Sequence, residues 1–290
     1  MEASRRLVLI GLIPCLVLFG RALGQTEAPP QGHVVAVNGI EMYYEVYGQP
    51  QASAVVLLHW FGVSGEIRRP FVRELEKHYR VILVDLRGHG RSTNPAGQFT
   101  IPQTALDVFA LLDQLGIQKF KGIGAVLGAF TLLHMATKQP ARVEAMILVG
   151  GASYIPDQLR AIVRNSPPEK MTEGNFNEMR KYAKRGDDQV RALARIFYNF
   201  KDNYDDVNFT PPYLSTITAR TLVVQGDRDD FIPVQMAVDL FRSIPHSYLW
   251  ILPNRSLFSV FDPQNSQEFA RMALEFIAEI GKRNAELAAE

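Results

Sequence analysis

Residues 121–130 constrain the fold of this chain more than any other stretch. The segment begins as a short apolar strand, passes Gly124 and Gly128, and continues into apolar residues of helical period. Glycines at this spacing let a strand and the helix that follows it come close together through a sharp turn. Val126 lies between the two glycines, at the tip of the turn. We therefore expect a buried strand to lead directly into a closely packed helix here.

Strand and helix patterns alternate along most of the chain. Asn38-Gly39 is typical of a hairpin turn, and continuous Val/Leu runs are typical of strands buried on both faces. The expected strands are 33–37, 42–47, 54–59, 80–86, 144–149, 221–225 and 248–252, and the expected helices are 66–78, 102–115, 233–243 and 266–282. This alternation predicts an α/β fold, a mostly parallel twisted sheet with helices on both faces.

The alternation breaks at 154–214, where helical patterns rich in charged and aromatic residues indicate an inserted helical cap. The core of the domain is then formed by 33–153 and 215–285. A linker at 25–32 precedes it, and a short tail at 286–290 follows it.

The first 24 residues have a different character from the rest. Arg5 and Arg6 precede an apolar run at 7–19, and small residues follow at 22–24. This pattern predicts a cleaved secretory signal and a secreted or periplasmic protein. The run is shorter than the roughly 20 residues that a membrane span needs, so we expect no span in the mature chain. Cys15, the single cysteine, lies inside the predicted signal.

The composition is that of an ordinary globular chain, with 47% hydrophobic residues and a formal net charge of +1. Such a balance gives no electrostatic basis for nucleic-acid binding. We also expect no cofactor and no metal ion.

Several short motifs, taken in order, identify a family. They are 59–62 after the third strand, the turn-rich loop 85–92, the glycine frame around Val126, the segment 226–229 and the segment 252–254. From about residue 33 to 280 the chain resembles the α/β-hydrolase superfamily, specifically its small esterase, haloperoxidase-like and C–C hydrolase members with a helical cap. The glycine frame corresponds to the G-x-S-x-G nucleophile elbow of that family.

The resemblance implies positions for a catalytic triad, and two of them hold unsuitable residues. Val126 stands at the position of the nucleophilic serine, and Leu257 stands at the position of the histidine. Asp229 matches the triad acid, with Asp227 and Asp230 as neighbouring alternatives. Loss of the serine or the histidine alone costs on the order of a millionfold in a well-studied serine protease, so hydrolysis through an acyl-enzyme is not expected.

The oxyanion hole of the family is built from backbone N–H groups, which do not depend on side-chain identity. By position these donors are Leu127 and Phe61, with Trp60 as the alternative to Phe61. Val126 raises a separate question, because a β-branched residue disfavours positive φ. Either the turn relaxes, or packing of roughly 1–3 kcal/mol compensates the strain.

Other polar groups are candidates to substitute for the missing serine and histidine. His59 and His89 belong to loops at the C-terminal ends of strands, where ligands bind in open α/β sheets. Ser256 and Ser259 lie near Leu257, but a serine without an adjacent base is a weak nucleophile. We interpret His134 as a packing histidine and His246 as a surface histidine.

Three functional interpretations follow. In the first, the protein is a pseudo-hydrolase that binds a small apolar ligand, or a protein partner, in a pocket lined by Trp60, Phe61, Val126 and Leu257. In the second, it is an active hydrolase of an ester or C–C bond that uses a non-standard mechanism around Asp229. In the third, the pocket is filled and the cap alone makes protein contacts.

Overall fold

The computed structural model describes residues 32–261 and 263–287. The predicted signal at 1–24, Cys15 and all of the predicted linker except residue 32 lie outside the described residues. Within the described part of the chain, none of the helices combines the length and the apolar character that a membrane crossing requires.

The described residues form an eight-stranded sheet in the order β1-β2-β4-β3-β5-β6-β7-β8. The first two strands form an antiparallel hairpin through Asn38 and Gly39, β2 pairs antiparallel with β4, and all other neighbours are parallel. The strands are β1 Gly32–Val37, β2 Ile40–Tyr47, β3 Ala54–Leu58, β4 Arg80–Val84, β5 Phe120–Ala125, β6 Val143–Val149, β7 Arg220–Gly226 and β8 Ser247–Leu252. The predicted α/β class and mostly parallel sheet are confirmed.

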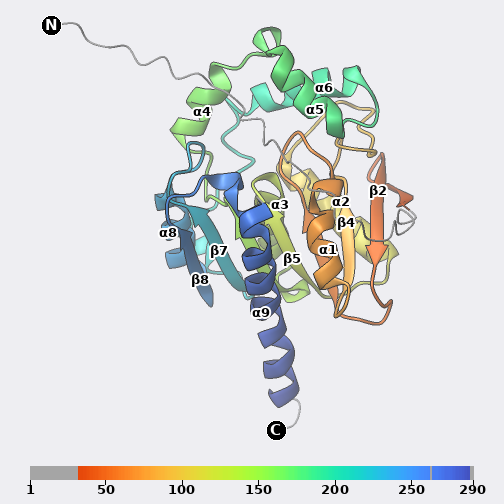
Figure 1. Cartoon of the computed structure of the whole chain (residues 1–290), viewed down its shortest axis with the longest axis vertical. Coiled ribbons are helices and arrows are strands. Elements are labelled where there is room, and N and C mark those ends of the chain that lie inside the picture. Colours follow the sequence, from red (N-terminus) through yellow and green to blue (C-terminus); the bar gives the residue numbers. More distant parts are fainter. Residues whose placement is uncertain (1–31, 262, 288–290) are drawn as a thin grey trace, which may run out of the picture.

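Helices cover both faces of the sheet, with α1 and α9 on one side and α2, α3 and α8 on the other (Figure 1). Their bounds are α1 Arg69–Leu75, α2 Ile101–Gln114, α3 Leu127–Lys138, α4 Asp157–Arg164, α5 Glu173–Tyr182, α6 Asp187–Asn199, α7 Pro211–Leu214, α8 Val234–Ser243 and α9 Pro263–Leu287. The apolar side chains form two buried clusters, one on each face. Both clusters take side chains from the central strands because these strands are buried on both sides.

Two expected helices have different bounds. The helix expected at 66–78 is divided into a 3₁₀ turn (Gly65–Arg68) and α1, with Pro70 in the first turn of α1. Proline has no N–H to donate and is therefore favoured at a helix start. The last helix, expected at 266–282, extends over Pro263–Leu287 and thus includes the first residues of the predicted tail.

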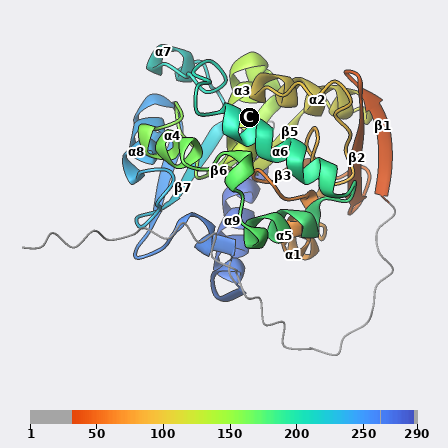
Figure 2. The same cartoon turned by 90° about the horizontal axis from the view of Figure 1, so that it is seen from above.

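Between β6 and β7 the chain forms α4, α5, α6 and α7. In Figure 1 α4, α5 and α6 lie at the top of the molecule, and Figure 2 shows them lying over the sheet when viewed from above. An isolated antiparallel bridge between Tyr154 and Asn208 joins the two ends of this segment. The helices thus cover the C-terminal ends of the parallel strands.

Candidate active site

The turn from β5 into α3 has the backbone of a nucleophile elbow. Val126 adopts φ 48° and ψ −100° and directly precedes the helix. Its N–H donates to the Val149 carbonyl at 2.9 Å, and the Gly128 N–H donates to the His59 carbonyl at 3.1 Å. Of the two alternatives left open by the sequence, the turn does not relax. Strain of about 1–3 kcal/mol at Val126 is offset by the packing and hydrogen bonds around the turn.

The two glycines of the elbow lie against backbone. A Cβ added at Gly124 would lie 2.4 Å from the carbonyl carbon of Gly128, and one added at Gly128 would lie 2.5 Å from the carbonyl oxygen of Leu58. Backbone atoms cannot swing aside as the end of a long side chain can. The glycine spacing is therefore required by the contact of β3, β5 and α3.

We expect Gly128→Ala to lower the free energy of unfolding by about 1–3 kcal/mol or more, because the added methyl overpacks the contact with Leu58. Gly174→Ala is the matched control, since Gly174 lies in α5 and an added Cβ there meets its nearest atom at 3.9 Å. That change should stabilise by roughly 0.5–1 kcal/mol through helix propensity. Urea unfolding measures both, and equal effects would contradict the close approach at the elbow.

The two backbone donors predicted for an oxyanion hole are both free. Leu127 is the first residue of α3, where N–H groups have no partner inside the helix. Among the described residues, no hydrogen bond has the Leu127 or the Phe61 N–H as its donor. The bond from Gly128 to His59 brings the loop that bears Phe61 against the elbow.

Asp229 lies in the turn after β7, is only 8% exposed and accepts three hydrogen bonds. Its Oδ1 accepts the N–H groups of Phe231 (2.7 Å) and Ile232 (3.0 Å), and its Oδ2 accepts Nε2 of Gln225 (2.6 Å). Burial raises the pKa of Asp229, and these donors oppose the rise. The amide of Gln225 thus binds one of the two oxygens with which a triad acid could orient a histidine. Gln225 is not among the site residues predicted from the sequence.

The segment that bears Leu257 is tied to the Asp229 turn. The Asp227 N–H donates to the Leu252 carbonyl (3.2 Å), and the Arg228 N–H donates to the Arg255 carbonyl (2.9 Å). Leu257 begins the 3₁₀ turn Leu257–Phe261; its side chain lies outside the described part of the chain. The three positions predicted for the triad therefore follow the C-terminal ends of β5, β7 and β8.

Both ring nitrogens of His59 are engaged in the structure of the loop. Nε2 accepts the Leu86 N–H at 3.0 Å, and Nδ1 donates to the Trp60 carbonyl at 2.7 Å. The ring is fully buried, and burial holds its pKa well below the usual range. A neutral imidazole with both nitrogens occupied cannot accept a proton from a substrate.

His89 is also fully buried, and its ring lies edge-on against Phe61 with centroids 4.8 Å apart. Its Nδ1 lies 3.0 Å from the Arg87 carbonyl, and its Nε2 has no hydrogen-bond partner among the described residues. Burial lowers the pKa of His89 to about 4. It is therefore a poor base at neutral pH.

The lowered pKa of His89 predicts a pH dependence of stability. A histidine that titrates near 6.5 when unfolded and near 4 when folded stabilises the native state above pH 6.5, and this contribution is lost as the pH falls toward 4. The full loss is about 3 kcal/mol. We expect the stability difference between wild type and His89→Gln to shrink by that order between pH 7 and pH 4 in urea unfolding. A difference independent of pH would contradict the neutral buried state.

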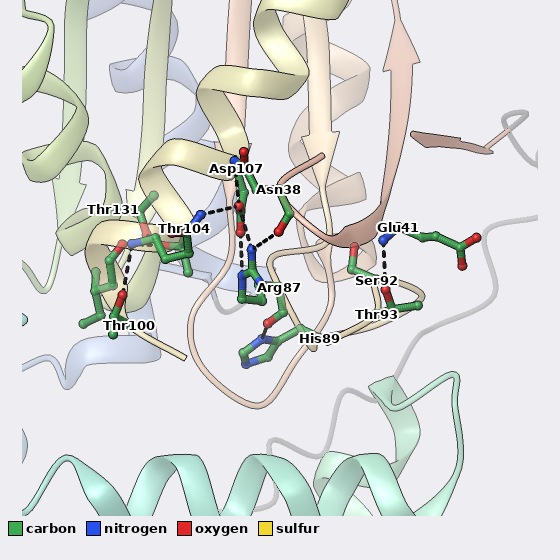
Figure 3. A network of polar contacts seen from close by, with 12 residues as sticks. Asn38, Glu41, Arg87, His89, Ser92, Thr93, Thr100, Thr104, Asp107 and Thr131 are labelled. Atoms are coloured by element: carbon green, nitrogen blue, oxygen red, sulfur yellow. Dashed lines mark hydrogen bonds and ion pairs between the residues drawn. The ribbon is translucent and has the colours of Figure 1, made fainter. Parts of the chain in front are cut away.

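The loop 85–92 is fixed by a buried ion pair that no sequence motif predicts. Arg87 donates Nε and Nη2 to the two carboxylate oxygens of Asp107 at 2.7 and 2.8 Å, and Asn38 and Gln103 donate to the same carboxylate. Figure 3 shows Arg87, Asn38 and Asp107 pointing toward one another. The pair is almost fully buried. It joins the β1–β2 hairpin, the loop and α2.

The residues predicted to line one pocket do not pack as a single group. Phe61 packs on Phe197 and Phe200 from the cap, with ring centroids 5.4 and 5.9 Å apart, and Phe61 and Val126 both contact the cluster on the α2/α3 face. Trp60 contacts the cluster on the other face. Adjacent residues of the loop point to opposite sides, so Trp60 and Phe61 are separated. The role of these residues in binding stays a prediction.

Rings nevertheless connect the segments of the site. Trp60 lies against Phe258 with centroids 5.0 Å apart, and Phe258 lies 6.2 Å from Phe231, which follows the Asp229 turn. Val126 is partly exposed, as are Phe61 and Phe197. Apolar surface thus reaches solvent beside the elbow.

Comparison with known proteins agrees with this geometry. Residues 53–196 match the family model for the alpha/beta hydrolase fold. The chain is 25% identical to 3-oxoadipate enol-lactonase 2 of Acinetobacter baylyi over 79% of this chain and 91% of that protein. It is 24% identical to the human serine hydrolase BPHL over 84% of this chain and 85% of that protein.

A solved structure gives the same result for the fold. The enol-lactonase of Burkholderia xenovorans LB400 matches with a TM-score of 0.68 at 24% identity, covering 85% of this chain and all of that one. The sheet order, the elbow backbone and these similarities agree, and the chain is a member of the α/β-hydrolase superfamily.

Proposed function

We propose that this protein is a non-catalytic member of the superfamily, which binds a small apolar molecule at the partly exposed apolar side chains between the elbow and the cap. The observation that carries the proposal is Val126 at the tip of a fully formed elbow, where a hydroxyl would be needed for attack. Leu257 at the histidine position removes the base as well. In the location predicted from the signal pattern, such a protein would act outside the cytoplasm.

The contacts of the remaining polar groups support this over a non-standard hydrolase. Asp229 is held by two backbone N–H groups and by Gln225, and His59 uses both nitrogens within its loop. His89 has a free Nε2, but with a pKa near 4 it would hold very few protons at neutral pH and would activate a nucleophile weakly. No paired nucleophile and base results from these positions.

The class of ligand follows from the side chains that reach solvent beside the elbow. Val126, Phe61 and Phe197 are apolar and partly exposed, and the free N–H groups of Leu127 and Phe61 supply two donors. A mostly apolar lining with a few fixed polar groups is typical of small-molecule sites. We infer an apolar ligand that carries one acceptor, such as a carbonyl oxygen.

Binding of Nile red, an uncharged apolar dye with a carbonyl, tests this proposal. We expect saturable fluorescence enhancement with the wild type, and affinity about tenfold weaker with Val126→Ser, because two methyl contacts are lost. Val234→Ser is the matched control, since Val234 is an exposed valine at the start of α8.

Unchanged binding in Val126→Ser, or equal loss in the control, would contradict a site at the elbow. Absence of saturable binding by the folded wild type would favour the remaining interpretation, in which the cap aromatics fill the space and the cap makes protein contacts.

A further inference from the structure

Arg68 is a buried cation that has no charged partner within the described ranges 32–261 and 263–287. It ends the 3₁₀ turn before α1 and is 2% exposed. Its Nε, Nη1 and Nη2 have no hydrogen-bond partner among the described residues. Nothing in the proposed function uses this residue.

The surroundings of Arg68 are apolar and aromatic. Its guanidinium carbon lies 4.0 Å from the ring centroid of Phe261 and 5.1 Å from that of Trp60. Other rings, those of Phe71 and Phe269, pack edge-on against Phe261 at 5.7 and 5.5 Å. The cation is therefore enclosed on the α1/α9 face of the sheet.

The three other buried cations in the described chain all have hydrogen-bond partners: Arg160 donates to backbone carbonyls, and the other two pair with acids. Arg87 pairs with Asp107, and Lys121 pairs with Glu144. Burial alone lowers the pKa of Arg68, to about 9, with no contribution from an acidic group. At neutral pH the guanidinium therefore stays protonated.

Ring contacts do not compensate a charge buried in this way. A cation–π contact contributes much less than the free energy that it costs to remove an ion from water, even after the protein relaxes around the charge. An isolated charge of this kind is expected to have a counter-charge or solvent beside it.

A small cavity lies at Arg68. Its volume is about 10 Å³, and it is lined by Arg68 together with apolar residues alone, Leu57, Phe71, Leu75, Ile123, Phe269, Ala270 and Ala273. A volume of this order admits roughly one water-sized particle. Carboxylates and phosphates are too large for it.

The chemistry of the lining distinguishes a water molecule from a monatomic anion as the occupant of the cavity. A buried water needs about two to four polar partners, and it must donate its own hydrogens to acceptors. Arginine has donors only, and the other lining side chains offer neither donors nor acceptors. A monatomic anion accepts hydrogen bonds and donates none, and it also supplies the missing charge.

We propose that the cavity beside Arg68 is a binding site for one halide ion, chloride under ordinary conditions, which neutralises the guanidinium. The ion stabilises the packing of the 3₁₀ turn, α1 and α9, and it is not part of the ligand site proposed at the elbow.

Urea unfolding in a chloride series tests the site, with sodium gluconate replacing sodium chloride at constant ionic strength. Urea is uncharged, and gluconate is too large for the cavity. If only the native state binds the ion, the folding equilibrium constant rises about tenfold for each tenfold rise in chloride above the dissociation constant. Bromide should act in the same way.

Two variants test whether the chloride dependence of stability requires Arg68. Arg68→Met should abolish the chloride dependence and remain folded, because an apolar side chain of similar length replaces the charge. Arg69→Met is the matched control, since Arg69 is the next residue and pairs with Glu45 at a half-exposed position. It should retain the full chloride response.

Bromide-soaked crystals provide a readout that does not depend on stability. We expect an anomalous peak within contact distance of the Arg68 guanidinium. No chloride response in the wild type, an equal response in Arg68→Met, or an occupied cavity without anomalous signal would each overturn the proposal.

Discussion

Replacing Asp107 with alanine will destabilise the protein by about 3–5 kcal/mol, the largest single effect on stability that we expect. The change leaves Arg87 buried without its carboxylate and removes the acceptor of Asn38 and Gln103. An uncompensated buried charge costs more than the lost attraction alone. Since a domain is stable by only about 5–15 kcal/mol, a substantial unfolded population should follow at elevated temperature.

Asp113→Ala is the matched control on the same helix. Asp113 pairs with Arg142, but its side chain is 58% exposed, and an exposed pair contributes about 0–1 kcal/mol. The double change Arg87→Met with Asp107→Leu should recover part of the loss, because both charges are then removed. Urea unfolding of the three variants checks the prediction. Similar values for Asp107→Ala and Asp113→Ala would contradict the role given to the buried pair.

The second large effect concerns activity. We expect Val126→Ser combined with Leu257→His to hydrolyse short-chain esters about a hundredfold or more faster than the wild type, as a positioned base does elsewhere. The elbow backbone, the free N–H groups of Leu127 and Phe61, and the buried carboxylate of Asp229 are already present. An ionised carboxylate has several acceptor positions, so Gln225 leaves room for a histidine N–H.

Each single change is the control for the double change. Triad members act as a unit, so Val126→Ser and Leu257→His alone should stay near the wild-type rate. Adding Asp229→Asn to the double variant should remove the gained activity. A folded double variant without activity would contradict the view that the backbone of the site is intact.

The sequence predicted the fold because its signals were local. The Val/Leu runs predicted the buried strands, Asn38-Gly39 predicted the hairpin, and the spacing of Gly124 and Gly128 predicted the elbow. The positions of Val126, Asp229 and Leu257 followed from motif order, and the structure places their segments at the C-terminal ends of the strands.

The remaining features depend on residues far apart in the chain. Nothing near Arg87 in the sequence indicates Asp107, and nothing near Arg68 indicates that Phe261 will cover it. The contact of Gln225 with Asp229 spans only four residues, but it depends on the shape of the turn after β7. Trp60 and Phe61 are adjacent and are predicted to line one pocket, whereas the loop turns them to opposite faces.

The central claim is that Val126 leaves the elbow without a nucleophile. Intact-mass measurement of the wild-type protein after incubation with a fluorophosphonate tests it most directly, with the double variant as the positive control. We predict no adduct on the wild type and one adduct, at position 126, on the double variant. A stoichiometric adduct on the wild type would show an activated nucleophile elsewhere in the chain and would contradict the claim.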